Sequence, residues 1–400
     1  MPPSPSAFAG LVIPYLQRQS WFLADMSRFD RGAWATFRIA DLEILLDGRP
    51  GMASVVVAVG NRPFHVLVGW RDPTLAPAVL GDHQGAVLGM CDDGSGDVLC
   101  YDALADEELS AGLLAVASAG YESARRARLV QSLVSHASLV YDERLFMKSY
   151  RVLEPAPRPE IELMLRLDEV GFKHTLRPVA RWERNGWDLA LVREYIPGAV
   201  EARLLALTSL RDLLGRSLDD EQMKLEEVGG AGGDLSSEVR RLGELTAGLH
   251  LALAEAFGVR PLVGDEASLG VAIRVHGDYH LRRVFRTDAG WIVAGFGDDP
   301  LIGKVGDPMT RPEPRFASPL EDLADLSYSL RQVAAEAVAA QPAVTRVRAE
   351  RLAKSWERRN RGAFLSGYLG VDGINRLMAV DRSGAAEAIK VLVARRATAT

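Results

Sequence analysis

The stretch "VHGDYHLRRVFRTDAGWIVAGF", residues 275–296, constrains the fold of this chain more than any other part. Asp278 stands in a short turn between His276 and His280, and a hydrophobic hairpin from Val284 to Phe296 follows. Aspartate is common in turns because its side chain caps nearby backbone amides, which is the simpler interpretation. The alternative is a catalytic loop whose carboxylate accepts the proton of an attacking hydroxyl. The hairpin directly after the loop favours the catalytic interpretation.

Composition limits the class of protein. A chain of 400 residues with 48% hydrophobic and 25% charged residues predicts two or three packed globular units. The formal net charge of −6 argues against a nucleic-acid partner, which would require a basic surface. The two cysteines, Cys91 and Cys100, could join across a predicted hairpin, but so few cysteines favour free thiols in a reducing cytoplasm. We expect no signal peptide and no membrane span, because no apolar run approaches about 18 residues.

The order of apolar patterns divides the chain into three predicted parts. Residues 1–106 are rich in short β-branched runs and form a β-rich cap. Residues 107–198 contain two hairpins and one helix, which starts at Pro159 and stops at Gly171, and they end at a Pro-Gly break. Residues 199–400 are mainly helical. Leucines recur there at steps of three and four, as on the buried face of a helix: Leu242, Leu245, Leu249 and Leu253.

Lys148 closes an apolar β-run just before the acidic helix of the second part. Taken alone, it is an exposed strand end. In a nucleotide site, its ammonium group would hold phosphate oxygens, and a carboxylate of the helix would orient it. Glu162, one turn into that helix, is the candidate partner, whereas we expect Glu160 to be solvated in the first turn.

The motifs together resemble one family. The loop His276-Gly277-Asp278-Tyr279-His280-Leu281-Arg282-Arg283 is similar to the H-G-D-x-H-x-G-Q loop of the actinobacterial maltokinases, relatives of the aminoglycoside phosphotransferases with an added N-terminal cap. Further matches occur in the same order along nearly the whole chain: "VLCYDAL", "RLFMKSYRVLEPAPRPEIE", "LALVREYIPGA", "SLRDLLG", "LGELTAGLHLALAEAFG", "SPLEDLADL" and "WERRNRGAFLSGY".

This resemblance implies an α+β, bilobal protein-kinase-like fold with a small β-rich N-terminal cap. It also implies transfer of the terminal phosphate of ATP to a sugar or amino sugar, with Asp278 as the catalytic base. The family's acceptor is maltose, and near relatives phosphorylate glucosamine.

The resemblance also implies the nucleotide-binding residues. Lys148 would bind phosphate and Glu162 would orient it. Glu194, Tyr195 and Ile196 would form the hinge that grips adenine through its backbone groups.

Two departures concern the metal ion. The family's D-F-E-G-E-P motif aligns with "GFGDDP", so that Gly295 stands where the main magnesium ligand is expected. Arg283 replaces the second ligand, and its guanidinium would repel Mg²⁺ and could contact phosphate itself. Asp298 and Asp299 are candidates to replace the missing ligand, although a solvated acidic turn is the simpler interpretation of this pair.

The cap departs from the family as well. Of its W-F-x-G-K-G-R string only Trp21 and Phe22 remain, and residues 201–203 lack the usual Asp-Gly-Trp. Two functions therefore stay open. The first is an ATP-dependent sugar kinase with impaired or rearranged magnesium-dependent catalysis. The second is a pseudokinase that binds nucleotide or sugar without turnover, as the protein partner of an enzyme of glucan or amino-sugar metabolism.

Overall fold

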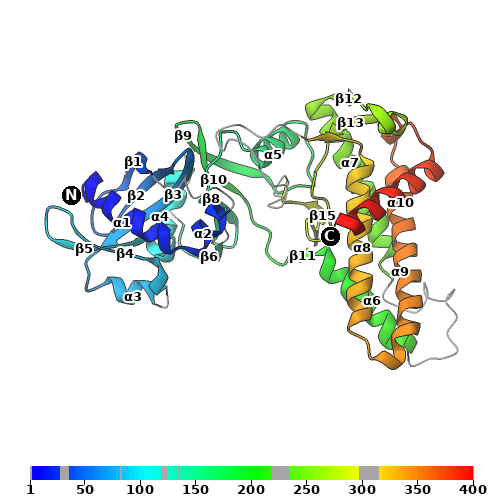
Figure 1. Ribbon diagram of the computed structural model, residues 1–400, viewed down its shortest axis with the longest axis horizontal. Helices are drawn as coiled ribbons and strands as arrows, with labels where there is room; N and C mark the ends of the chain where they lie inside the picture. The colour runs from blue at the N-terminus through cyan, green and yellow to red at the C-terminus, as the bar shows by residue number, and fades with distance from the viewer. Residues whose placement is uncertain are drawn as a thin grey trace. The chain divides into compact units, whose positions relative to one another are not determined.

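The computed structural model describes residues 2–27, 36–81, 83–118, 120, 122, 124–132, 135–218, 234–296 and 315–399. The chain forms two compact units (Figure 1). The first comprises the described residues up to 161 together with 177–197, and the second comprises 162–176 and the described residues from 198 onward. Every described helix is too short or too polar to span a bilayer.

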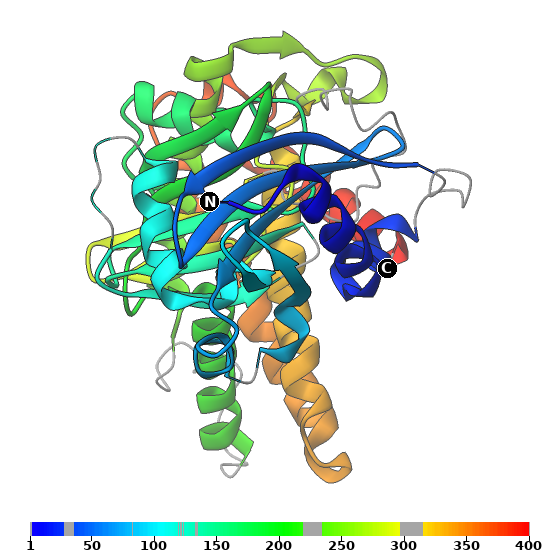
Figure 2. The same cartoon turned by 90° about the vertical axis from the view of Figure 1, so that its left-hand side faces the viewer.

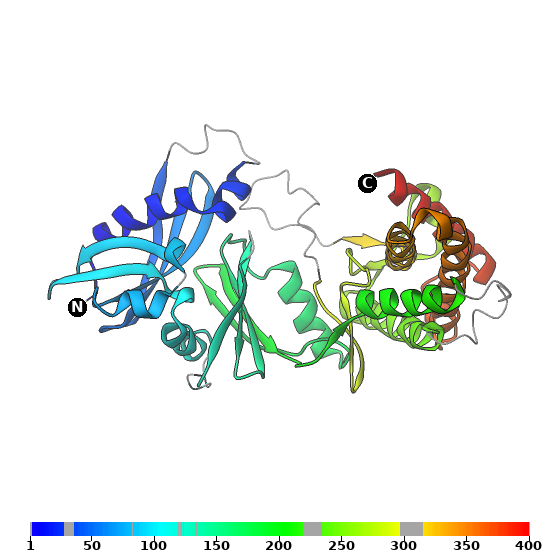
Figure 3. The ribbon, with the colours of Figure 1, turned by 90° about the horizontal axis from the view of Figure 1, so that it is seen from below.

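The first unit begins with the predicted β-rich region. Its five antiparallel strands are ordered β1-β2-β3-β5-β4. They are β1 (Phe37–Leu46), β2 (Gly51–Val59), β3 (Arg62–Arg71), β4 (Val87–Asp92) and β5 (Asp97–Asp102). Helices α1 (Pro5–Arg18) and α2 (Ser20–Met26) precede the sheet, and α1 lies along it (Figure 3). Helices α3 (Ala76–Leu80) and α4 (Glu107–Ala117) complete this part.

Aromatic side chains fill the space between the cap sheet and its two N-terminal helices. Phe8, Trp21, Phe22, Phe64 and Trp70 are all at most 6% exposed and belong to one core cluster. Burial of each such ring stabilises the fold by roughly 1.5–3 kcal/mol. Trp21 and Phe22, the residues retained from the family string, therefore have a packing role in the cap core.

A second antiparallel sheet follows in the order β6-β7-β8-β10-β9. Its strands are β6 (Ala127–Ser132), β7 (His136–Tyr141), β8 (Leu145–Tyr150), β9 (Pro178–Arg184) and β10 (Trp187–Glu194). Asp142 and Glu143 make the β7–β8 turn with φ of 49° and 52°, as Asn185 and Gly186 do at β9–β10 with 50° and 78°. Positive φ at both central residues is the two-residue hairpin turn that matches strand twist. Both predicted hairpins are confirmed.

A buried polar cluster joins the cap to the second sheet. The Tyr15 hydroxyl donates to Asp102 Oδ2 over 2.8 Å, and Arg151 Nη2 donates to the same oxygen over 3.1 Å. The guanidinium of Arg151 also lies 4.7 Å from the ring centroid of Trp21, and the backbone amide of His65 donates to the Arg151 carbonyl. Buried charges are tolerated only when they are paired and hydrogen-bonded, so this cluster fixes the two sheets to each other.

Helix α5 (Pro159–Glu169) separates β8 from β9. Proline at the first helical position costs no hydrogen bond, and Gly171, with φ of 76°, ends the segment. The predicted limits of this helix are confirmed.

The second unit is mainly helical, as predicted. Its helices are α6 (Ala202–Leu218), α7 (Ser236–Phe257), α8 (Leu320–Ala339), α9 (Ala343–Leu369) and α10 (Arg382–Ala399). Helices α8 and α9 run side by side (Figures 1 and 2). A Cβ atom on Gly243 of α7 would lie 2.1 Å from the Phe364 carbonyl oxygen of α9, so glycine permits the close approach of these helices. The four predicted core leucines of α7 are buried.

Two small sheets carry the loops of this unit. One has the order β11-β14-β15, and the other has the order β12-β13-β16. The strands are β11 (Val200–Glu201), β12 (Val259–Pro261), β13 (Val271–Arg274), β14 (Val284–Thr287), β15 (Gly290–Val293) and β16 (Phe316–Ala317). The β14–β15 pair is the hairpin predicted after Asp278, so the loop "HGDYH" lies between β13 and β14.

Candidate functional site

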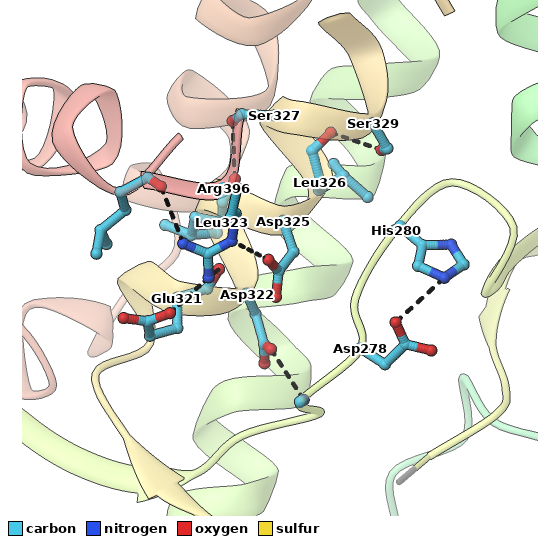
Figure 4. Close-up of polar contacts among 12 residues, drawn as sticks. Asp278, His280, Glu321, Asp322, Leu323, Asp325, Leu326, Ser327, Ser329 and Arg396 are labelled. Atoms are coloured by element: carbon cyan, nitrogen blue, oxygen red, sulfur yellow. Dashed lines mark hydrogen bonds and ion pairs between the residues drawn. The ribbon is translucent and has the colours of Figure 1, made fainter. Parts of the chain in front are cut away.

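The loop between β13 and β14 is held by a buried carboxylate, that of Asp322 at the start of α8. Asp322 accepts hydrogen bonds from the backbone amides of His276 and Gly277 over 2.8 and 3.1 Å. Its side chain points toward the loop of Asp278 in Figure 4. His250 Nε2 lies 3.2 Å from it, and the Tyr368 hydroxyl lies 2.9 Å from His250 Nδ1. Burial opposes ionisation of Asp322, yet its contacts with His250 and the loop prevail and lower its carboxyl pKa. Asp322 therefore stays charged and fixes the loop.

His276 connects this loop to the end of β15. Its Nε2 lies 3.2 Å from the carbonyl oxygen of Ala294, and the Asp278 amide donates to its Nδ1 over 3.3 Å. Burial lowers the pKa of His276 to about 4, so the imidazole is neutral at pH 7. The neutral ring must carry its proton on Nε2, because Nδ1 accepts. In this tautomer the ring of His276 bridges the amide of Asp278 and the carbonyl oxygen of Ala294, the residue before Gly295.

The Asp278 carboxylate is in contact with two side chains, those of Arg283 and His280, rather than left open. Arg283 donates to Oδ2 through Nε over 2.9 Å and through Nη2. His280 Nε2 lies 3.3 Å from Oδ1 (Figure 4). Burial opposes ionisation of Asp278, but the hydrogen bonds from His280 and Arg283 prevail and lower its carboxyl pKa. Asp278 is thus an ionised proton acceptor of reduced basicity, and its side chain keeps 21% exposure.

Arg283 also fills the space beside Gly295. A Cβ atom on Gly295 would lie 2.7 Å from Arg283 Nη1 and 2.8 Å from Arg283 Cδ, and Gly295 has φ of 74°. A side chain at 295 would therefore require the flexible end of Arg283 to shift from the position in which it bonds Asp278. Arg283 and Gly295, the two departures from the family motifs, are therefore in direct contact.

These residues do not fit a divalent cation. Gly295 offers no side-chain oxygen, and the guanidinium of Arg283 is bonded to the carboxylate of Asp278. Across the described part of the chain, no group of three or more His, Cys, Asp and Glu side chains could hold a metal ion. Asp298 and Asp299, the candidate replacements, lie outside the described residues.

In the first unit, Lys148 of β8 forms a buried ion pair with Glu160 of α5. Its Nζ lies 3.0 and 2.8 Å from the two Glu160 oxygens, and the Tyr150 hydroxyl donates to Glu160 over 3.3 Å. Glu160 is 8% exposed, so the expectation that it is solvated was wrong. As the second residue of α5 it lies in the turn beside the sheet, where a charge would be costly unless paired. The role predicted for Glu162, which is partly buried, stays a prediction.

The predicted hinge residues lie at the end of β10 and just beyond it. The Glu194 amide donates to the Arg177 carbonyl over 3.0 Å, and the Tyr195 amide donates to the Arg144 carbonyl over 2.9 Å. Ile196 follows and is partly buried. Their contact with a nucleotide base stays a prediction.

Comparison with known proteins identifies the cap and the fold. Residues 15–106 match the model of the maltokinase N-terminal cap domain. A glucosamine kinase in complex with glucosamine, ADP and inorganic phosphate superposes with a TM-score of 0.56 at 19% identity, over 90% of this chain and 89% of the other.

The chain has a kinase-like fold with a maltokinase-type cap. A second structure, glucosamine kinase in crystal form B, gives a TM-score of 0.57 at 18% identity, over 92% of each chain. The α+β kinase-like fold with a β-rich N-terminal region, expected from the sequence, is therefore confirmed.

Asp322 is the site residue that sequence reasoning missed. It lies 46 residues beyond His276, in "SPLEDLADL", a string noted only for its similarity to the family. Its position on the buried face of an amphipathic helix was the available signal, because a charge there needs a buried partner.

Proposed function

We propose that this protein is a nucleotide-dependent sugar phosphotransferase of the maltokinase type in which Arg283 takes the place of a metal-binding side chain. The observation that supports this proposal most directly is the position of the Asp278 loop. The buried Asp322 holds this loop, and Asp278 is bonded to Arg283, which packs against Gly295. The cap domain and the glucosamine kinase fold support a sugar or amino sugar as the acceptor.

In this proposal the acceptor hydroxyl approaches Asp278, whose ionised carboxylate accepts its proton. The sugar oxygen forms a bond to the terminal phosphorus of ATP as the bond from that phosphorus to ADP breaks. Lys148, oriented by Glu160, holds phosphate oxygens of the nucleotide. Glu162 and the hinge residues Glu194, Tyr195 and Ile196 remain the proposed neighbours of the nucleotide.

Arg283 would neutralise phosphate charge, and its pairing with Asp278 competes with that contact. A guanidinium donates to two oxygens in one plane and does not change its geometry during transfer. We therefore expect slow turnover with little dependence on Mg²⁺. Asp298 and Asp299 are the residues to examine if strong magnesium dependence is found.

The ion pair between Arg283 and Asp278 also favours a second function, a pseudokinase. If Arg283 never leaves Asp278, the carboxylate remains a proton acceptor of reduced basicity, too weak for efficient transfer. The protein would then bind nucleotide or sugar and act on a protein partner in glucan or amino-sugar metabolism. The scarcity of cysteine, two in 400 residues, is consistent with a reducing, cytoplasmic location for either function.

Isothermal titration of ATP, with Mg²⁺ and with EDTA, tests the proposal beside an assay of phosphate transfer to maltose, glucosamine and other sugars. We expect the nucleotide affinity to change less than about tenfold, or ~1.4 kcal/mol, on removal of Mg²⁺. Slow transfer to one sugar supports the kinase, and binding without transfer supports the pseudokinase. Fast transfer that requires Mg²⁺ would refute the assignment of Arg283.

A further inference from the structure

Helix α9 presents exposed apolar and basic side chains in one line along its outward face. Val344 and Val347, in its first two turns, are 93% and 63% exposed. Arg351, Lys354 and Arg358 follow and are also exposed. Successive members of this series are three or four residues apart, so they lie on the same face of the helix. We refer to these five residues as the outer stripe of α9.

The buried side of α9 lies opposite the outer stripe. Leu352, Ala353, Trp356 and Asn360 are at most 3% exposed. Trp356 Nε1 donates to the hydroxyl of Ser209 on α6 over 3.0 Å, which fixes this side of α9 against its neighbour. With 3.6 residues per turn, the stripe lies about half a turn around the helix from these residues. The stripe is therefore a ridge on the outside of the helices and not the floor of a groove.

The basic side chains of the outer stripe are not used within the fold. Within the described part of the chain, none of the three has an ion-pair or hydrogen-bond partner through its side chain. By contrast, the nearby Arg359 pairs with Asp234 over 2.7 Å, and Arg361 pairs with Glu357 over 2.9 Å. Helix α9 holds seven Arg and Lys residues and two Glu residues, although the whole chain has a formal net charge of −6. The positive charge is therefore a local patch on an acidic protein, and such patches steer the approach of charged partners.

The turn that leads into the outer stripe is uncharged. Residues 337–345, which connect α8 to α9, contain no Asp, Glu, Lys, Arg or His. Ala339, Ala340, Pro342 and Ala343 in this turn are exposed. The turn lies at one end of the helix pair α8 and α9 (Figures 1 and 2). A small, uncharged and exposed end thus adjoins the basic part of the stripe.

A lipid surface matches this combination of charge, apolar exposure and shape. Nucleic acids offer phosphate groups to the cations but little apolar surface to Val344 and Val347. A helix of a partner protein binds in a groove, whereas the stripe is a ridge. A second copy of this chain, packed stripe to stripe, would bring like charges together. An anionic bilayer attracts Lys and Arg to its headgroups and takes up small apolar side chains just below them.

We propose that the outer stripe of α9 attaches this protein to an anionic lipid surface. The two valines enter the headgroup layer, and the three cations contact lipid phosphates. At 1.5 Å per residue the stripe is about 21 Å long, enough to reach several headgroups. The cytoplasmic leaflet is anionic, so this attachment agrees with the cytoplasmic location given above. It goes beyond the proposed function and does not depend on the nucleotide or sugar site.

The test is flotation of the full chain with vesicles of phosphatidylcholine, with and without phosphatidylglycerol. We expect at least about tenfold tighter binding to the vesicles that contain phosphatidylglycerol, and weaker binding as salt is added. Val344→Ser with Val347→Ser should weaken binding by about fivefold or more, because the apolar contact is lost. Val259→Ser with Val263→Ser is the matched control, since these valines are 54% and 80% exposed outside α9. It should leave binding unchanged.

A second pair of variants tests the charges. Arg351→Gln with Lys354→Gln should weaken binding to the anionic vesicles by about tenfold or more. The matched control is Lys390→Gln with Arg395→Gln, which removes two exposed cations from α10. Binding in this control should stay within about threefold of the unmodified protein.

Several results would overturn the attachment. They are the absence of binding to the anionic vesicles, equal binding to both kinds of vesicle, and equal losses in a stripe variant and its control. Displacement of the vesicles by a DNA duplex at equal phosphate concentration would show a general polyanion site, and it also overturns the proposal. None of these results bears on phosphate transfer, so the sugar kinase stands or falls separately. A thermal melt checks that each variant is folded, and if a stripe variant is not, the lipid preference and salt dependence of the unmodified protein decide.

Discussion

Replacing Gly295 by Asp and Arg283 by Gln together should create a magnesium-dependent kinase from this chain, whereas either change alone should not. The Cβ of Asp at 295 would lie 2.7 Å from Arg283 Nη1, well inside van der Waals contact, so the single variant must displace the guanidinium. The new carboxylate would then pair with Arg283 rather than with a cation. Arg283→Gln alone removes the pairing of Asp278 with the guanidinium but supplies no carboxylate at 295.

The expected gain in the rate of phosphate transfer can be taken from other active sites. Removing one group that stabilises charge in the transition state there costs about 3–4 kcal/mol, or 100- to 1000-fold in rate. Positive φ at 295 costs an Asp residue roughly 1–2 kcal/mol, which reduces the net gain. We therefore expect about 100-fold faster transfer to the best sugar in the double variant and less than about tenfold in each single variant.

The assay is nucleoside diphosphate release with the preferred nucleotide and sugar, at several Mg²⁺ concentrations. Gly295→Asp with Arg282→Gln is the matched control, because Arg282 is an exposed neighbour that carries the same charge. If the free-energy gains in transfer rate of the two single variants simply add in the double variant, residues 283 and 295 do not act together and the reasoning is refuted. An equal gain in the control would refute it as well.

Three further predictions concern residues described above. Asp278→Asn should abolish any phosphate transfer while leaving the melting temperature within a few degrees, and unchanged turnover would place the base elsewhere. Glu160→Gln should weaken nucleotide binding by about tenfold or more, and Glu162→Gln by less, because Glu160 holds Lys148; titration of both variants decides which carboxylate matters. Burial lowers the pKa of His65 and His276 to about 4, from an ordinary value of 6.5. The unfolded chain therefore binds more protons between these values, and each histidine should reduce the free energy of unfolding by about 2 kcal/mol between pH 7 and pH 5. Equal urea midpoints at the two pH values would contradict this.

Local signals in the sequence sufficed for the strands, turns and helix limits that were predicted correctly. Asp142 and Glu143 separate two apolar runs, and Pro159 and Gly171 bracket α5; each acts through backbone geometry within a few residues. Such signals do not specify which side chains meet across the fold. The burial of Glu160 depends on how the first turn of α5 packs, and no local pattern records that.

The contacts around Asp278 were predicted only in part. The sequence marked Arg283 and Gly295 as departures, but their contact depends on a rotamer and on a positive φ that no motif encodes. The bond from Asp322 to the loop joins residues 46 positions apart, beyond the reach of periodicity. Similarity to a family singled out the residue positions, whereas their contacts depend on the folded structure.

The close packing of Arg283 against Gly295 also bears on the order in which the two residues arise in evolution. In an ancestor with a side chain at 295, an arginine at 283 would meet that side chain and would have to adopt another position. Once residue 295 has become glycine, the guanidinium of an arginine at 283 fits beside it. A later side chain at 295 would then require this guanidinium to shift, which makes the reverse substitution less favourable. Glycine should therefore precede arginine on a reconstructed tree, and the loss should be difficult to reverse by single steps. A form with glycine at 295 and an uncharged residue at 283 would accept a new side chain at 295 without displacing a guanidinium.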